Sequence, residues 1–225
     1  MAKRAKKQDD ESIKKDWREG ELIEAFKLNR ITEYQTPLME EWLDVVPAAL
    51  NIHEQYSFNK DLARAQKNIT GWNEEDLKMK FLSPILELGY LMDDDIVIGY
   101  FDKIISATIE GIKLTVKSDF MLAKGVLDVF KIPYFHFQEY KPYKNPTGDS
   151  MAQLLEAFLI AQEKNQNGKP MYGVDIMGYN WRFVIMEGKD YCISKPFNAI
   201  DQTQVLTIIA ILRQFKHILL TRLMD

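Results

Sequence analysis

Two acidic residues and one lysine stand at positions where their side chains could act together on a phosphate ester. Asp119 lies late in a strand-like stretch, and Glu139 and Lys141 lie two residues apart at the end of another. Because residues two apart share one face of a strand, Glu139 and Lys141 are expected to point the same way. If the two strands pair, the carboxylates of Asp119 and Glu139 meet across the ladder.

Such a pair of carboxylates has a defined chemistry. Two carboxylates at close range repel each other unless a cation lies between them. Oxygen ligands with open positions suit Mg²⁺ or Mn²⁺. A lysine beside the metal can orient or help to deprotonate an attacking water and can stabilise the charge that forms on phosphorus. The pattern predicts metal-assisted phosphodiester hydrolysis, with Asp119 and Glu139 binding the metal and Lys141 working with the water.

The E-x-K tripeptide is a weak signal by itself, because such a short pattern arises readily by chance. A second copy, Glu187-Gly188-Lys189, flanks a glycine just past a strand and is interpreted as a solvated turn. Only the Glu139 copy ends an aromatic strand, has an acid on an earlier strand and leads into a helix. Plainer alternatives remain: Asp119 as an exposed strand residue, and Lys141 as a strand-end lysine.

Other common site types find no support in the sequence. It contains no G-x-G-x-x-G, no P-loop pattern and no G-x-S-x-G elbow. The three histidines, His53, His136 and His217, lie in separate elements without ligand spacing, and His136 is expected to pack in the core. A single cysteine, Cys192, excludes a disulfide framework and a multi-cysteine zinc site. Dinucleotide binding, hydrolase triads and zinc chemistry are therefore disfavoured.

The arrangement Asp119 … Glu139-Tyr140-Lys141 resembles the PD-(D/E)XK nuclease superfamily. The stretch 73–90 (NEEDLKMKFLSPILELGY) is similar to the opening helix of the amino-terminal nuclease domain of type I restriction enzyme R subunits. The resemblance spans about residues 70–190 and implies a restriction-endonuclease-like core. Ser118 stands where the family name has proline, and no helicase motifs follow.

The resemblance also implies roles for residues outside the two strands. Glu74 matches a helix glutamate that joins the metal site, although an acid in a first helical turn also stabilises the helix dipole. Gln153 matches a glutamine that contacts substrate, although Ser150-x-x-Gln153 is also a capping-box sequence. Apart from the resemblance, the position of Lys144 in a turn after the Glu139 strand predicts that it edges the same cleft, where it either contacts phosphate or is simply solvated.

Hydrophobic periodicity predicts the elements that must position these side chains. A helical pattern covers 16–66, and an Asn73 cap followed by acids starts a helix that ends at Gly89. We expect further helices over 150–164 and 203–223, and strands over 96–101, 104–109, 112–122, 133–141, 172–177 and 181–186. A turn is expected at Lys124-Gly125, and the last two strands are expected to form a hairpin across 178–180. The order predicts an α/β fold with a mixed central β-sheet flanked by helices and an α-helical N-terminal extension. The expected divisions are a flexible tail (1–15), a helical region (16–69) and the α/β core (70–225).

The composition indicates whether the chain can form a core, where the protein is located and whether its charge attracts nucleic acid. The 225 residues are 46% hydrophobic and 12% aromatic, which is ample for a buried core. No apolar run follows the basic N-terminal residues and no uncharged run approaches the length of a membrane span, so we expect a cytoplasmic protein without membrane contact. The net charge of −4 provides no global attraction for nucleic acid, so any such binding would rely on a local basic lining.

The leading hypothesis is a Mg²⁺- or Mn²⁺-dependent endonuclease acting on DNA, with RNA open as an alternative and restriction or defence as the expected setting. A second hypothesis keeps the fold without catalysis, as a nucleic-acid-binding or assembly module. A third is a helical interaction protein whose sheet is only a scaffold. A protein partner or homodimer is expected to use the helical regions. The apolar stripe of the last helix is interpreted as core, with a dimer surface as the alternative.

Overall fold

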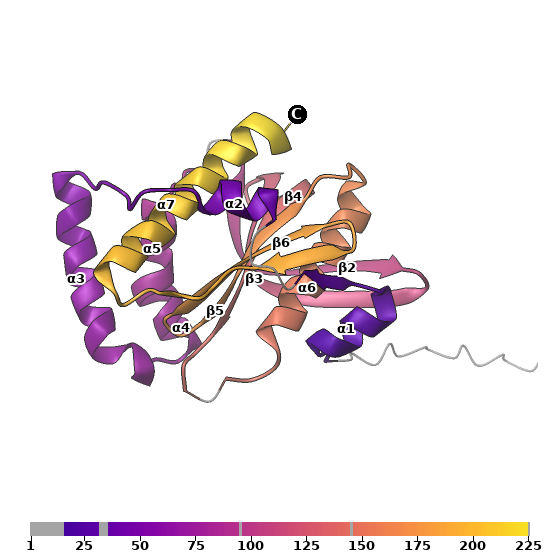
Figure 1. Ribbon diagram of the computed structural model, residues 1–225, viewed down its shortest axis with the longest axis horizontal. Helices are drawn as coiled ribbons and strands as arrows, with labels where there is room; N and C mark the ends of the chain where they lie inside the picture. Colours follow the sequence, from indigo (N-terminus) through magenta and orange to yellow (C-terminus); the bar gives the residue numbers. More distant parts are fainter. Residues whose placement is uncertain (1–15, 32–35, 95, 145, 225) are drawn as a thin grey trace, which may run out of the picture.

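The computed structural model describes residues 16–31, 36–94, 96–144 and 146–224 (Figure 1). The predicted tail over 1–15 lies outside the described residues. Eight strands form one mixed sheet in the order β1-β7-β6-β5-β4-β3-β2, with β8 paired to β6. The strands are β1 (Asn29–Ile31), β2 (Ile98–Ile109), β3 (Ile112–Val126), β4 (Val129–Lys141), β5 (Met171–Met177), β6 (Asn180–Glu187), β7 (Asp190–Ile193) and β8 (Phe197–Asn198). The expected α/β class with a mixed sheet flanked by helices is confirmed.

Helices cover both faces of this sheet (Figure 1). They are α1 (Glu19–Phe26), α2 (Pro37–Leu43), α3 (Ile52–Asn68), α4 (Glu74–Leu77), α5 (Ser83–Leu88), α6 (Ser150–Asn165) and α7 (Gln202–Ile218). One apolar core lies between the sheet and α2, α3, α4, α5 and α7. The other lies between the sheet and α1 and α6. Strands β4 and β5 are parallel neighbours near the middle of the sheet, so residues at their carboxyl ends are covered from both sides.

The predicted helix over 73–88 forms with Asn73 as its N-cap, whose Oδ1 accepts the Asp76 N–H at 2.7 Å. Its middle, Lys78–Leu82, is a π-helical turn between α4 and α5. Pro84 has no N–H to donate to the preceding turn. The freed carbonyl of Lys80 instead accepts a hydrogen bond from Arg64 Nη2 at 2.8 Å, which joins α3 to this helix.

The strands of the middle region are longer than predicted. The two strands expected over 96–101 and 104–109 are one continuous strand, β2, which pairs with β3 along its length. The turn expected at Lys124-Gly125 lies instead at Leu127-Asp128, because β3 continues to Val126 and β4 begins at Val129. The predicted hairpin of β5 and β6 is confirmed.

The periodicity predicted a purely helical N-terminal region, but the structure also contains a strand there. β1 pairs in parallel with β7, with Arg30 opposite Tyr191, and so forms one edge of the sheet. The pattern could not reveal this strand, because three residues are too short to show an alternation and their partner lies about 160 residues away.

The last helix is a core element. Its predicted apolar stripe is fully buried in this chain, which rules out that stripe as a dimer surface; it comprises Val205, Ile208, Ile209, Leu212, Phe215 and Leu219. Trp42 of α2 packs beside it, and its Nε1 donates to the Ile211 carbonyl at 3.0 Å. The helical stretch Gln202–Leu223 is long and apolar enough to cross a membrane by length and composition, a test that core helices of soluble proteins also pass.

Candidate active site

The two strand carboxylates come together where the β3–β4 ladder ends. The last regular pair at this end joins Phe120 to Gln138, and Asp119 is the next residue along β3. Beyond that pair, Asp119 Oδ2 accepts the backbone N–H of Tyr140 at 2.8 Å. This hydrogen bond ties the Asp119 side chain to the backbone that follows Glu139. The structure places the Asp119 and Glu139 carboxylates close enough together for the Asp119 charge to raise the pKa of Glu139.

Glu139 is the most unusual side chain of this pair. It has no exposed surface, and neither carboxylate oxygen meets a described residue at good hydrogen-bond geometry, although the side chain and backbone of Asp119 lie close enough to act on its proton. Burial raises the pKa of Glu139 well above its ordinary value of 4.5, and the neighbouring Asp119 charge raises it further, while Lys141 opposes the shift. A buried carboxyl group without partners is costly when ionised. A divalent cation between Glu139 and Asp119 would offset this cost, with the two carboxylates as its ligands.

Lys141 lies on the same face of β4 as Glu139. This is the face on which Phe137 packs against Phe158 of α6, with ring centroids 6.2 Å apart. The Lys141 side chain is 7% exposed and lies close enough to lower the pKa of Glu139. Lys141 is therefore a buried cation beside a buried acidic pair, which suits a proton-handling or charge-stabilising role.

The opposite face of β4 carries a separate polar chain. His136 Nε2 lies 3.0 Å from Gln138 Nε2, and the Tyr140 hydroxyl donates to Gln138 Oε1 at 2.9 Å. The His136 ring packs against Phe215, and burial lowers the pKa of His136 from 6.5 to about 3. The prediction that His136 packs in the core is confirmed.

Glu74 lies next to the acidic pair. It is the first residue of α4 and is half-buried. Burial raises the pKa of Glu74, the Asp119 charge adds to the rise, and Lys141 opposes it. The neighbouring Glu75 is exposed and faces Lys78 at 3.6 Å instead. Within the described ranges, no three His, Cys, Asp or Glu side chains lie close enough together to hold a metal ion.

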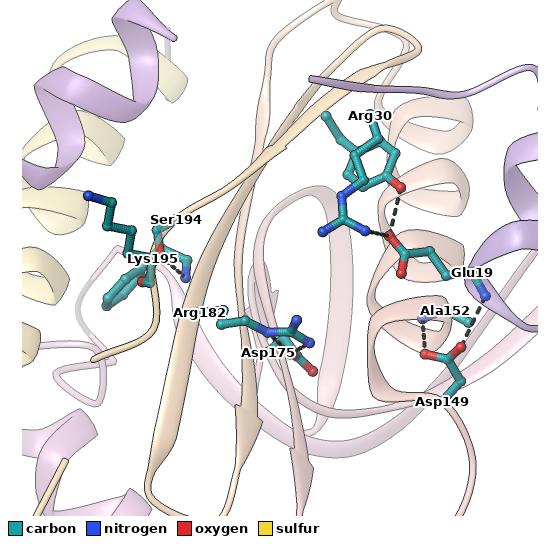
Figure 2. Close-up of polar contacts among 10 residues, drawn as sticks. Glu19, Arg30, Asp149, Ala152, Asp175, Arg182, Ser194 and Lys195 are labelled. Atoms are coloured by element: carbon teal, nitrogen blue, oxygen red, sulfur yellow. Dashed lines mark hydrogen bonds and ion pairs between the residues drawn. The ribbon is translucent and has the colours of Figure 1, made fainter. Parts of the chain in front are cut away.

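Gln153 lies in the first turn of α6, but the predicted capping box does not form. The N-cap is Asp149, not Ser150; its Oδ1 accepts the Ala152 N–H at 3.1 Å and its Oδ2 accepts the Glu19 N–H at 3.0 Å (Figure 2). The contact that Asp149 also makes with α1 favours this start of the helix. Gln153 Oε1 is consequently buried without a partner among the described residues.

Lys144 is exposed in the loop between β4 and α6. No hydrogen bond or ion pair joins it to another residue in the part of the chain that the structure describes. Its position three residues after Lys141 keeps it near the carboxyl end of β4, but the structure does not bring its ammonium group into contact with the acidic pair.

A second acid beside Glu139 was not anticipated from the sequence. Asp175 of β5 is directly opposite Glu139 in the parallel register and is 1% exposed. Arg182 of β6 donates to Asp175 Oδ2 through Nε at 2.8 Å and also through Nη2 (Figure 2). Asp175 Oδ1 is buried without a partner within the described residues. An aspartate inside an apolar strand (MYGVDIM) was the available signal.

A hollow of about 530 Å³ opens beside this end of the sheet. Arg182 and Met177 line it from the β5–β6 hairpin, the 148–151 segment lines it from the start of α6, and Trp17 and Glu19 line it from the start of α1. The hollow therefore lies on the same side of the sheet as the buried Asp175–Arg182 pair and next to the loop that follows Lys141.

A lysine pair flanks the site on the β2 side. Lys78 Nζ lies 3.0 Å and Lys117 Nζ 2.7 Å from the carboxylate of Asp102. Burial tends to raise the pKa of Asp102, but the two lysines outweigh it and the pKa is lowered. These contacts fix α4, and with it Glu74, against the β2–β3 hairpin.

A scan against protein-family models finds no match for this sequence, and a search of curated proteins finds no significant match.

Proposed function

We propose that this protein is a Mg²⁺- or Mn²⁺-dependent nuclease that hydrolyses phosphodiester bonds in DNA. The observation that carries the proposal is the Glu139 carboxyl group, fully buried, without a hydrogen-bond partner among the described residues, and adjacent to Asp119 and Lys141. A protein that used this sheet only as a scaffold would gain stability from an apolar residue at the same position.

Each residue of the site has a distinct role in the proposal. Asp119 and Glu139 would hold the cation, with Glu74 approaching from the start of α4. The bound cation would supply Lewis-acid activation of the phosphate and of a water molecule. Lys141 orients the attacking water and offsets the negative charge that develops on phosphorus.

Substrate contacts are assigned to Gln153 and Lys144. Gln153 presents an amide with an unpartnered oxygen at the first turn of α6, where it can position the nucleic acid beside the acidic pair. Lys144 extends from the adjoining loop and can contact a phosphate group.

Calorimetric titration with Mn²⁺ tests the metal site without any substrate. We expect the wild type to bind the ion and both Asp119→Asn and Glu139→Gln to lose most of the binding. Glu187→Gln is the matched control, because Glu187 belongs to the other E-x-K sequence and is exposed. Metal binding that survives both substitutions would refute the assignment of Asp119 and Glu139 as metal ligands. Metal-dependent cleavage of DNA by the wild type would then be tested separately.

The second candidate is a catalytically silent module that binds nucleic acid or assembles with a partner. It is favoured by one observation: no three potential ligands are grouped closely enough for a metal in the described part of the chain. DNA binding by the wild type with no metal-dependent cleavage, unchanged in Lys141→Ala, would support this candidate over the nuclease.

A further inference from the structure

An aromatic pair lies directly beyond the end of β4. Tyr143 and Tyr179 stack with ring centroids 5.1 Å apart and an interplanar angle of 20°. Tyr143 belongs to the loop after Lys141 and is 47% exposed, whereas Tyr179 lies in the turn between β5 and β6 and is half-buried. The pair of tyrosines therefore presents an aromatic surface to solvent near the carboxyl end of β4, the strand that carries Glu139.

The backbone around the two rings is closely fitted. The Gly178 N–H donates to the Lys141 carbonyl at 2.8 Å, and the Tyr179 carbonyl accepts the Ala199 N–H at 2.8 Å. Gly178 has φ +59°, and a Cβ at this position would lie 2.8 Å from the Tyr143 Cβ. The loop after β4 and the β5–β6 turn are thus joined by a hydrogen bond and by close packing. The two rings are therefore already stacked before any ligand binds.

The location of the rings indicates what they can bind. Two residues of extended chain span at most about 7 Å, which is about two steps of 3.4 Å along a nucleic-acid strand. A phosphate held at Lys141 would therefore bring a base of the same strand within reach of Tyr143. Lys144, exposed next to Tyr143, adds a positive charge for the backbone of that strand.

We propose that Tyr143, supported by Tyr179, is a stacking platform for an unpaired base of the DNA strand whose phosphate lies at Asp119, Glu139 and Lys141. This inference rests on the proposed nuclease function and specifies its substrate. A base inside a continuous duplex already stacks on both neighbours, whereas an unpaired base has a free face for an aromatic ring. The preferred substrate is therefore single-stranded or locally unpaired DNA.

Fluorescence anisotropy with a labelled thymidine oligonucleotide, compared with a duplex of equal length, tests this platform. Ca²⁺ replaces Mg²⁺ so that binding is measured separately from cleavage. Tyr143→Ala is expected to weaken single-strand binding roughly 5- to 150-fold, since stacking on an aromatic ring has this effect per base. Tyr143→Phe keeps the ring and should bind within about twofold of the wild type. Tyr56→Ala is the control, because Tyr56 is an exposed tyrosine of α3.

Three results would overturn the platform. One is equal single-strand binding by Tyr143→Ala and wild type, which would leave the nuclease proposal intact. Another is an equal loss on duplex and single strand, and the third is loss in Tyr143→Phe as large as in Tyr143→Ala. Tyr143→Leu, which keeps apolar volume without an aromatic face, should behave like Tyr143→Ala, and matching melting curves show that all variants are folded. Failure of the nuclease proposal is seen separately, as absent metal binding and absent cleavage.

Discussion

Replacing Glu139 by glutamine in metal-free protein should stabilise the fold, because the structure buries this carboxyl group without a hydrogen-bond partner in the described residues. Glutamine keeps the shape and removes the charge. The pKa of Glu139 is raised above 4.5 in the folded protein by burial and by Asp119, so the folded state holds its proton more tightly than the unfolded state does. Stability therefore falls as pH rises from about 4.5 through the raised pKa.

The expected gain is the extra cost of burying this group as a charge rather than as a neutral amide, on the order of 1–3 kcal/mol. For a chain of this size each kcal/mol shifts the melting temperature by about 2–4 °C. Glu139→Gln should accordingly melt about 2–12 °C higher than the wild type at mildly alkaline pH. The difference should shrink toward zero below pH of about 4.5, where the carboxyl group is protonated in both states.

Thermal melting followed by circular dichroism, in the presence of a chelator and across this pH range, measures the effect. Glu187→Gln, an exposed change of the same type, should leave the melting temperature unchanged. Adding Mn²⁺ should then raise the melting temperature of the wild type and not that of Glu139→Gln, because only a ligand of the folded state stabilises it. A Glu139→Gln protein that is less stable than the wild type at alkaline pH would refute the reasoning.

Three further predictions concern other parts of the chain. Lys141→Ala should reduce DNA cleavage by about 10²- to 10³-fold while Mn²⁺ binding persists, measured by a gel-based cleavage assay with calorimetry, and intact cleavage would contradict the role of Lys141. The buried His136, whose pKa is about 3, should make stability fall by about 1.4 kcal/mol per pH unit between pH 6.5 and about 3, since the unfolded state takes up the proton first. Denaturant titrations at several pH values should show that the free energy of unfolding changes less with pH in His136→Phe than in the wild type. An unchanged pH dependence would assign the acid sensitivity to another group. Arg64→Met should cost about 1–3 kcal/mol by leaving the Lys80 carbonyl without its donor, and a change within error of zero by the same titration would show that water replaces it.

Local patterns in the sequence predicted most of the helices and hairpins. The helix after Asn73 and the β5–β6 hairpin depend on caps, turns and periodicity within a few residues, and these signals act whatever the rest of the chain does. The same reasoning misplaced the turn between β3 and β4, where a glycine at 125 looked like a turn but lies within a long strand.

Part of the candidate site was also accessible from the sequence. Glu139 and Lys141 share a face because strand geometry demands it. Asp119 lies near Glu139 because the two strands pair, which the sequence left as a condition. Asp175 was missed, since its place beside Glu139 depends on the parallel pairing of β4 with β5, which the helix α6 separates in the chain.

The sequence by itself determined most of the helix and strand segments, the α/β class and the acidic residues and lysine of the candidate site, because these depend on side-chain type and on spacing of a few residues. Tertiary structure alone decided that β1 joins the sheet through β7, that Asp149 rather than Ser150 caps α6, and that the Glu139 carboxyl group is sealed from water. These features arise from contacts between segments far apart in the chain, and burial and pairing over such distances leave no periodic trace in the residues that make them.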